Sequence, residues 1–322
     1  MPTPIMAAGQ IIVRTATALD VCSDWTLAPR YGFLSDFAPD ERNTAERLAA
    51  QSQVAPLYIE VWSPNDTYRD LHEIILNARR LRNGRSPVLA AYINAFLSTD
   101  ESIRRGAVNA LRLLTAAIFL NGGSQIILGE QNGVLCDPYF PPYVHLTPSE
   151  VRAVRADYDF ISRHAEYFFD PAWRDISATR VGGINEETRL AVPRYGPLAE
   201  DNSIWTIVRE RENEITLGLV NLCGGTARWN ESKPKPRTVR PFNLTVRVPR
   251  EIKRVYYLTP EQGGGATQLR FARKKGEVRL TLPGLVVWSA DCLKVIELHT
   301  VRSNIQVSKV QGQRHVGMVN GC

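Results

Sequence analysis

The stretch that decides the fold of this chain is residues 56–75, which read PLYIEVWSPNDTYRDLHEII. An apolar run continues to Val61 and Trp62, a polar break follows, and the residues after it have the spacing of an amphipathic helix. This order predicts a β-strand, a short loop and a helix. A single carboxylate, Glu60, lies near the end of the apolar run. Because a glutamate is almost never fully buried unless it is paired, Glu60 needs either a partner or a chemical task.

The same unit of strand and helix recurs between residues 30 and 170. Its last helix, expected over 147–169, has clear start signals, with Thr147 as the N-cap, Pro148 at the first helical position and Glu150 completing a capping box. Near-continuous apolar strands that alternate with amphipathic helices are typical of a parallel sheet covered by helices. The expected strands are 30–37, 56–62, 87–96 and 124–130, and the expected helices are 38–51, 66–84, 101–123 and 147–169.

Beyond about residue 200 the pattern changes to short strands separated by glycine, proline and charged turns. This spacing is typical of an antiparallel β-sandwich. Residues 171–202 read as an irregular linker between the two parts. The sequence therefore predicts an α/β part over residues 30–170 and an all-β part over 203–300, with 301–322 as a tail.

The composition is that of a globular chain and argues against several classes of function. The net charge of +6 comes from scattered lysines and arginines, which favours a solvated basic face over a nucleic-acid surface. The five cysteines form no CxxC motif and the five histidines no HExxH pair, so we expect neither a disulfide framework nor a metal site. No glycine-rich stretch matches a nucleotide-binding loop, and we expect no cofactor. Neither a signal peptide nor an apolar run of membrane-spanning length is visible, so no membrane partner is expected.

Polar side chains follow the expected parallel strands near the point where each strand ends. In a sheet of this kind those ends share one rim, where functional side chains gather. Paired carboxylates at such a rim suit glycoside hydrolysis, in which one protonates the leaving oxygen and the other attacks or activates water. Acids at strand ends are nevertheless common in α/β proteins, and Trp62 and Tyr92 suit core packing as well as a sugar face. The candidates are the polar residues Asp36, Glu60, Asn94 and Glu130, with the aromatic residues Trp62, Tyr92 and Tyr139.

The order of several segments resembles glycoside hydrolase family 66, which contains dextranases and cycloisomaltooligosaccharide glucanotransferases. Residues 18–37 resemble the start of the family's catalytic barrel, 58–80 resemble a later barrel segment, and 113–168 resemble the end of the barrel. The residues after 200 resemble the family's C-terminal domain. This resemblance covers about residues 18–298 in segments. It implies a partial (β/α)8 barrel of the TIM type, an antiparallel β-sandwich after it, and residues 1–29 as a remnant of an N-terminal β domain.

The resemblance also implies roles for individual residues. Enzymes of the family are retaining and act on α-1,6-linked glucan with an aspartate nucleophile and a glutamate acid/base. Glu60, in YIEVW, matches the acid/base glutamate, and Trp62 would form a wall of its pocket. Partial desolvation of such an acid keeps its proton in place near neutral pH. Glu130, in IILGE, matches a carboxylate that lines the substrate groove. The expected substrate-binding residues are Asp36, Trp62, Tyr92, Asn94, Glu130 and Tyr139.

The chain departs from the family's pattern in the middle of the barrel. In the family, several βα units, including the unit with the nucleophile, separate the strands that correspond to 30–37 and 56–62. Here residues 38–55 hold only one expected helix and a loop. Before LGE the family has His-Ile-Glu, whereas residues 125–127 read QII. We expect Asp36 to bind substrate or cap a helix rather than to replace the nucleophile. A real deletion and an imperfect gene model would both explain the missing units.

Three classes of function remain open from the sequence. The first is a family 66 glycoside hydrolase homologue with a remnant α-glucan cleft, whose activity is doubtful because the nucleophile-bearing segment is missing. The second is a non-catalytic protein that binds an α-glucan such as dextran or isomaltooligosaccharide. The third is an assembly protein whose basic sandwich face contacts a partner. In each case a partial barrel has raw edges and an exposed apolar face, so we expect a cover such as a second copy in a homodimer. Family relatives are commonly exported, although this chain shows no export signal.

Overall fold

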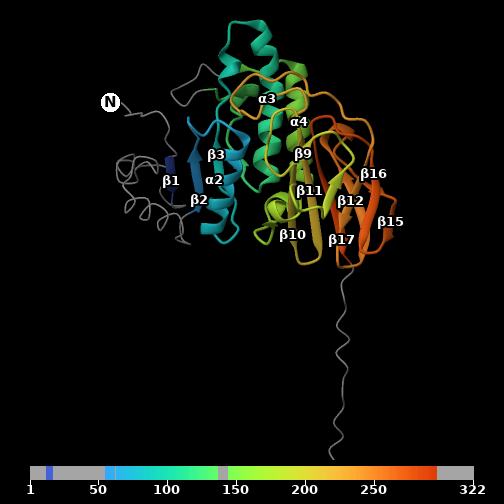
Figure 1. Ribbon diagram of the computed structural model, residues 1–322. Coiled ribbons are helices and arrows are strands. Elements are labelled where there is room, and N and C mark those ends of the chain that lie inside the picture. Colours follow the sequence, from blue (N-terminus) through green and yellow to red (C-terminus); the bar gives the residue numbers. More distant parts are fainter. Residues whose placement is uncertain (1–11, 17–54, 62, 137–143, 296–322) are drawn as a thin grey trace, which may run out of the picture.

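The computed structural model describes residues 12–16, 55–61, 63–136 and 144–295 (Figure 1). The expected strand at 30–37 and the expected helix at 38–51 lie outside the described residues. Three of the candidate site residues, Asp36, Trp62 and Tyr139, also lie outside them.

A small sheet of four strands occupies one side of the molecule, in the order β1-β2-β3-β4. Its central strands are parallel, as the sequence predicts, because β2 pairs with β3 and β3 with β4 in parallel register. The strand β1, which the sequence pattern does not predict, pairs antiparallel with β2 and covers its other edge. The strands are β1 (Ile12–Ala16), β2 (Ala55–Glu60), β3 (Val88–Ala90) and β4 (Ser124–Gln125).

Two of these strands are shorter than predicted. Instead of running over 87–96, β3 ends at Ala90, and a 3-10 helix, η2 (Asn94–Leu97), follows it. Instead of running over 124–130, β4 ends at Gln125, and the chain continues through η3 (Glu130–Asn132) into a two-stranded sheet. Ile93, Phe96 and Ile127 are nevertheless buried. The apolar runs therefore reflect burial against other elements, which periodicity alone does not separate from strand pairing. The two-stranded sheet comprises β5 (Gly133–Val134) and β6 (Val144–His145).

The helices start where their capping residues lie. Thr147 and Glu150 form the predicted capping box, and Thr67 forms the same arrangement with Asp70 at the helix that begins at Tyr68. The helix predicted over 147–169 is interrupted at His164, so it forms two helices. Within the described ranges, none of the helices is both long and apolar enough to cross a membrane. The helices are α2 (Tyr68–Leu81), α3 (Glu101–Leu120), α4 (Pro148–Arg163) and α5 (Ala165–Phe168).

Two larger sheets follow, and almost all of their strand pairs are antiparallel. The seven-stranded sheet has the order β14-β13-β17-β11-β10-β7, with β9 paired to β10, and the four-stranded sheet has the order β15-β16-β12-β8. Their strands are β7 (Arg174–Asp175), β8 (Thr188–Leu190), β9 (Tyr195–Gly196), β10 (Ile204–Arg211), β11 (Glu214–Asn221), β12 (Phe242–Arg247), β13 (Ile252–Leu258), β14 (Ala266–Leu269), β15 (Phe271–Lys274), β16 (Glu277–Leu282) and β17 (Trp288–Val295).

The segment 171–202, expected to be an irregular linker, contributes strands to both larger sheets. β7 and β9 pair with β10, and β8 pairs with β12. The 3-10 turn η4 (Ser177–Thr179) lies in the same segment, whereas η5 (Pro260–Gln262) connects β13 with β14. Strands of only two or three residues are too short to show the alternation of apolar and polar residues by which a strand is recognised in a sequence. This explains why the segment reads as irregular.

Two hydrophobic cores hold the layers together. One lies between the two larger sheets, with Leu217 and Leu244 among its fully buried members. The other joins the small sheet, the helices and the opposite face of the seven-stranded sheet, where Trp205 and Trp288 are buried. In Figure 1, α3 and α4 accordingly lie between β1–β3 and the larger sheets. Since the seven-stranded sheet is covered on both faces, β11 is buried along its whole length, whereas β12 alternates.

Candidate active site

Glu60 is the last residue of β2, and only 7% of it is exposed. The Tyr58 hydroxyl donates a hydrogen bond of 3.0 Å to Glu60 Oε1. The hydroxyls of Tyr58 and Tyr92 lie 3.4 Å apart, so the three side chains form one polar cluster. Side chains alternate along a strand, and Tyr58 and Glu60 therefore share one face of the sheet while Ile59 packs in the core. Tyr58 is therefore a partner of the kind that the sequence predicts for the buried Glu60.

Burial and charge keep Tyr58 a neutral donor. Desolvation is the largest cause that raises the pKa of Tyr58 far above its ordinary value, followed by the hydrogen bond with Tyr92 and the charge of Glu60. A phenol in this environment retains its proton over the whole physiological range. Glu60 Oε1 thus has a permanent donor, which makes a buried carboxylate tolerable at this position.

Of the other predicted site residues that the structure describes, only Tyr92 lies beside Glu60. Tyr92 lies in the Glu60 cluster and is 9% exposed. Asn94 is exposed at the start of η2, and Glu130 begins η3. Tyr58 is the member of the cluster that the sequence analysis missed. Its position two residues before Glu60, on the same face of the expected strand, is the signal that could have identified it.

The segment Gln125-Ile126-Ile127 lies at the end of β4, away from Glu60. Gln125 pairs in register with Leu89, and its side-chain Oε1 accepts hydrogen bonds from the Thr115 hydroxyl at 3.0 Å and the Tyr158 hydroxyl at 3.4 Å. Gln125 therefore contacts α3 and α4 rather than the face that carries Glu60. The next residue, Ile126, is 48% exposed. The Ile126 side chain has no hydrogen-bonding group, so the surface just beyond β4 is apolar at this residue.

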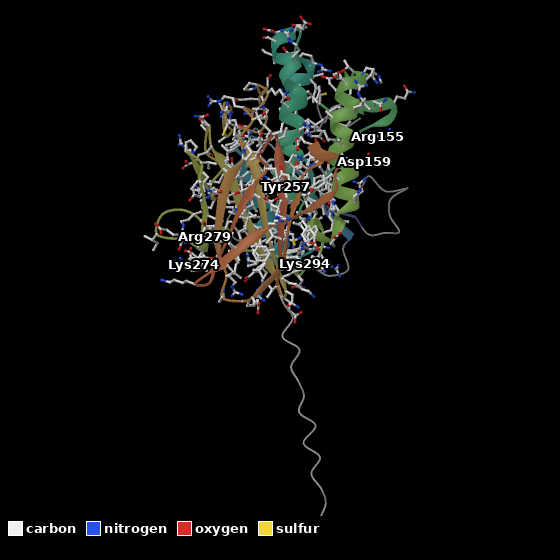
Figure 2. The ribbon with its side chains drawn as sticks, turned by 90° about the vertical axis from the view of Figure 1, so that its right-hand side faces the viewer. Arg155, Asp159, Tyr257, Lys274, Arg279 and Lys294 are labelled. Carbon is white, nitrogen blue, oxygen red and sulfur yellow. The ribbon has the colours of Figure 1, made fainter. Side chains whose placement is uncertain are left out.

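The basic stretch around residues 272–279 forms the hairpin β15–β16, on the far side of the larger sheets. Figure 2 shows Lys274 and Arg279 there, well separated from Arg155 on α4. Glu277 accepts hydrogen bonds from Arg279 at 2.6 Å and from Arg189 at 2.8 Å. These hydrogen bonds, that of Arg279 first, lower the pKa of Glu277 to about 2. Part of the positive charge is thus neutralised within the sheet, and the remainder faces solvent.

A separate groove runs along the outer side of α2. It has a volume of about 360 Å³ and is lined by residues that include Arg69, His72, Arg80 and Leu198. Leu71 and Ile75, on the other side of α2, are fully buried in the core, so the helix separates this groove from the small sheet. Among the described residues, no group of three histidine, cysteine, aspartate or glutamate side chains could hold a metal ion.

Comparisons with known proteins match most of the chain. The model of Glycosyl hydrolase family 66 matches residues 42–290. Two cycloisomaltooligosaccharide glucanotransferases of Niallia circulans are each 25% identical to the chain, over 194 and 222 residues. These alignments cover 58% and 62% of this chain but 19% and 22% of the relatives, so the chain spans about one fifth of their length.

A solved structure is similar over much of the same region. It is a cycloisomaltooligosaccharide glucanotransferase from Paenibacillus sp. complexed with cycloisomaltoheptaose, with a TM-score of 0.67 at 17% sequence identity. The match covers 77% of this chain and 53% of that chain. At this level of identity, the likeness concerns the fold.

Proposed function

Because the chain belongs to glycosyl hydrolase family 66, we propose that it retains a remnant α-1,6-glucan site in which Glu60 is the proton donor. The small sheet with its helices would be part of a (β/α)8 barrel, and the two larger sheets would be a β-sandwich. The observation that carries the proposal is Glu60 itself, a buried carboxylate at the carboxyl end of a parallel strand. Functional side chains of barrels come from this end of their strands.

The proposed chemistry follows from the cluster around Glu60. Tyr58 holds Oε1, which leaves Oε2 to meet a glycosidic oxygen. Glu60 would protonate that oxygen as the bond to the sugar breaks, and it would later accept a proton from water. Tyr92 and Asn94 would contact the sugar, together with Asp36, Trp62, Glu130 and Tyr139.

The proposed catalytic site has a proton donor but no assigned nucleophile. A retaining enzyme needs a second carboxyl group about 5–5.5 Å from the first. The family places its nucleophile on a strand within the units that this chain lacks between residues 38 and 55. This shortened segment favours a second candidate function, the binding of α-glucan without cleavage.

The decisive experiment combines dextran hydrolysis with dextran binding. We expect Glu60→Gln to abolish any release of reducing sugar by the wild-type protein, because an amide cannot donate the proton, while retention on a dextran column persists. Glu73→Gln is the control, since Glu73 is exposed on α2 and pairs with Arg69. Retention of the wild-type protein without any release supports the binding function. If the protein neither releases sugar nor binds dextran, the proposed site is wrong.

The edges of the small sheet lead to a proposal about assembly. In the described part of the chain, the sheet ends at β1 on one side and at β4 on the other, so it is open. Ile126 and Leu128, just beyond β4, are 48% and 41% exposed. Because open edges and apolar surface favour association, we expect a homodimer in light scattering. A single monomer peak with cooperative melting would contradict the partial-barrel proposal.

A further inference from the structure

The loop that follows β2 is hydrogen-bonded to a segment of the connection between β11 and β12. Backbone hydrogen bonds join Tyr68 N to Ala227 O and Trp229 N to Asp66 O, each at 2.9 Å. The Trp229 indole Nε1 also donates to Asn65 O at 2.7 Å. A short antiparallel bridge between Thr67 and Arg228 runs alongside. We call the segment 226–230 the brace.

Asp66 is the central residue on the other side of this contact. Its Oδ1 accepts from Asn230 Nδ2 at 2.9 Å, and its Oδ2 accepts from Arg228 Nη2 at 3.1 Å. Ser63, within the same loop, donates to Asp66 Oδ2 at 3.2 Å. The Asp66 side chain is only 15% exposed. Hydrogen bonds to an ionised carboxylate are stronger than neutral ones, so Asp66 ties both ends of the loop to the brace.

The brace is itself anchored at several points, which makes it a rigid support. Trp229 is 3% exposed and belongs to the core that the helices share. Ala227 N donates to Asp201 Oδ1 at 2.6 Å. Lys233, 2% exposed, donates to Thr226 O at 3.1 Å, and its backbone N donates to Gly106 O of α3 at 3.2 Å.

We propose that the brace is a positioning element for Glu60, so that the second half of the chain sets the geometry of the acid without contacting substrate. The inference rests on the proposed function of Glu60. Glu60 ends its strand, and the loop pinned by the brace begins within three residues of it. Supporting residues of this kind hold a site in productive geometry, and a displacement of about 1 Å can cost about 100-fold in rate. Trp229, Asp66 and Asn230 are the positioning residues.

The test compares two tryptophans that make the same kind of bond in different places. Trp229→Phe removes the donor to Asn65 O and keeps the ring. Trp173→Phe removes a matched bond, from Trp173 Nε1 to Glu166 O at 2.8 Å, and Trp173 is 2% exposed. Trp173 also lies under the guanidinium groups of Arg209 and Arg211, at 5.5 and 4.6 Å, so Trp173→Phe should lose at least as much stability as Trp229→Phe. The readouts are amide hydrogen exchange in residues 63–68, the ¹³C chemical shift of the Glu60 carboxyl group, and dextran binding or cleavage.

We expect Trp229→Phe to speed exchange in 63–68 about fivefold to tenfold, as the loss of one hydrogen bond would. We also expect it to move the Glu60 resonance and to weaken dextran binding or turnover about tenfold. Trp173→Phe should leave all three readouts unchanged. Equal effects of the two variants, or an unchanged Glu60 resonance in Trp229→Phe, would overturn the proposal.

Two provisions keep the test decisive. If Trp229→Phe fails to fold, Asp66→Asn takes its place, because it preserves the shape of the side chain, removes its charge and replaces one of the two oxygens that accept hydrogen bonds by a donor. If the wild-type protein neither binds nor cleaves dextran, the proposed function fails. The exchange rates and the Glu60 resonance still decide whether the brace positions Glu60.

Discussion

Replacing Asp157 by alanine is expected to lower the free energy of unfolding by about 3–5 kcal/mol, the cost of breaking a buried ion pair. Asp157 lies on α4, and its side chain is 1% exposed. Arg112 of α3 donates to it through Nε at 2.7 Å and Nη2 at 2.9 Å, and the Trp288 indole donates at 2.9 Å. Burial lowers the pKa of Arg112, but the hydrogen bonds and the charge of Asp157 outweigh this and hold it above its ordinary value. Alanine would leave Arg112 Nε and the buried Trp288 indole without their acceptor, and Arg112 would keep only Glu261, whose Oε1 lies 3.0 Å from Nη2.

Urea unfolding of the Asp157→Ala variant measures this effect. The control is Glu73→Ala, which breaks the Arg69–Glu73 pair of 2.8 Å, in which both side chains are more than half exposed. Exposed pairs contribute about 0–1 kcal/mol, so the control should change little. In the variant that combines Asp157→Leu with Arg112→Met, apolar packing should recover part of the loss. A loss below about 1 kcal/mol for Asp157→Ala would show that the pair does not join α3 and α4 to β17.

Asp291→Asn is expected to stabilise the protein at neutral pH by an amount that grows with pH. Asp291 lies in β17 and is fully buried. Its Oδ2 accepts from the Ser289 hydroxyl at 3.2 Å, and its Oδ1 is a buried oxygen without a hydrogen-bond partner among the described residues. Burial raises the pKa of Asp291 well above its ordinary value. Ionisation in this core is costly, and asparagine removes the ionisation while keeping the shape.

The direction of the pH dependence follows from proton linkage. The unfolded chain releases the Asp291 proton near pH 3.9, roughly the ordinary value, whereas the folded chain retains it to higher pH. The contribution to stability is therefore complete below about pH 3.9, and about 1.4 kcal/mol is lost per pH unit up to the raised pKa.

Urea unfolding of both proteins between pH 4 and pH 8 tests this prediction. The curves should meet near pH 4 and diverge above it. Asp159→Asn, on the outward side of α4 (Figure 2), makes the same replacement at an exposed position and should follow the wild type. A constant difference between the wild type and Asp291→Asn across the range would contradict a raised pKa.

Local signals in the sequence identified the elements that depend only on local interactions. The capping box of Thr147 and Glu150 starts α4 because its hydrogen bonds join residues three apart. The alternation of β12 and β16 appears in the sequence because each has one face in the core and the other exposed. The order of segments also identified the family, which the family comparison confirms.

The tertiary structure decided whatever depends on distant partners. β1 is a strand because β2 offers it an edge, and β17 is buried on both faces because helices cover one side of its sheet. The sequence singled out Glu60 as a carboxylate in an apolar run, and strand alternation places Tyr58 on the same face. The contact of Tyr58 with Tyr92, 34 residues away, depends on the tertiary structure. Likewise, no local pattern connects Asp66 with Asn230. The physical reason is that caps and alternation are short-range interactions, whereas pairing partners and burial depend on residues far apart in the chain.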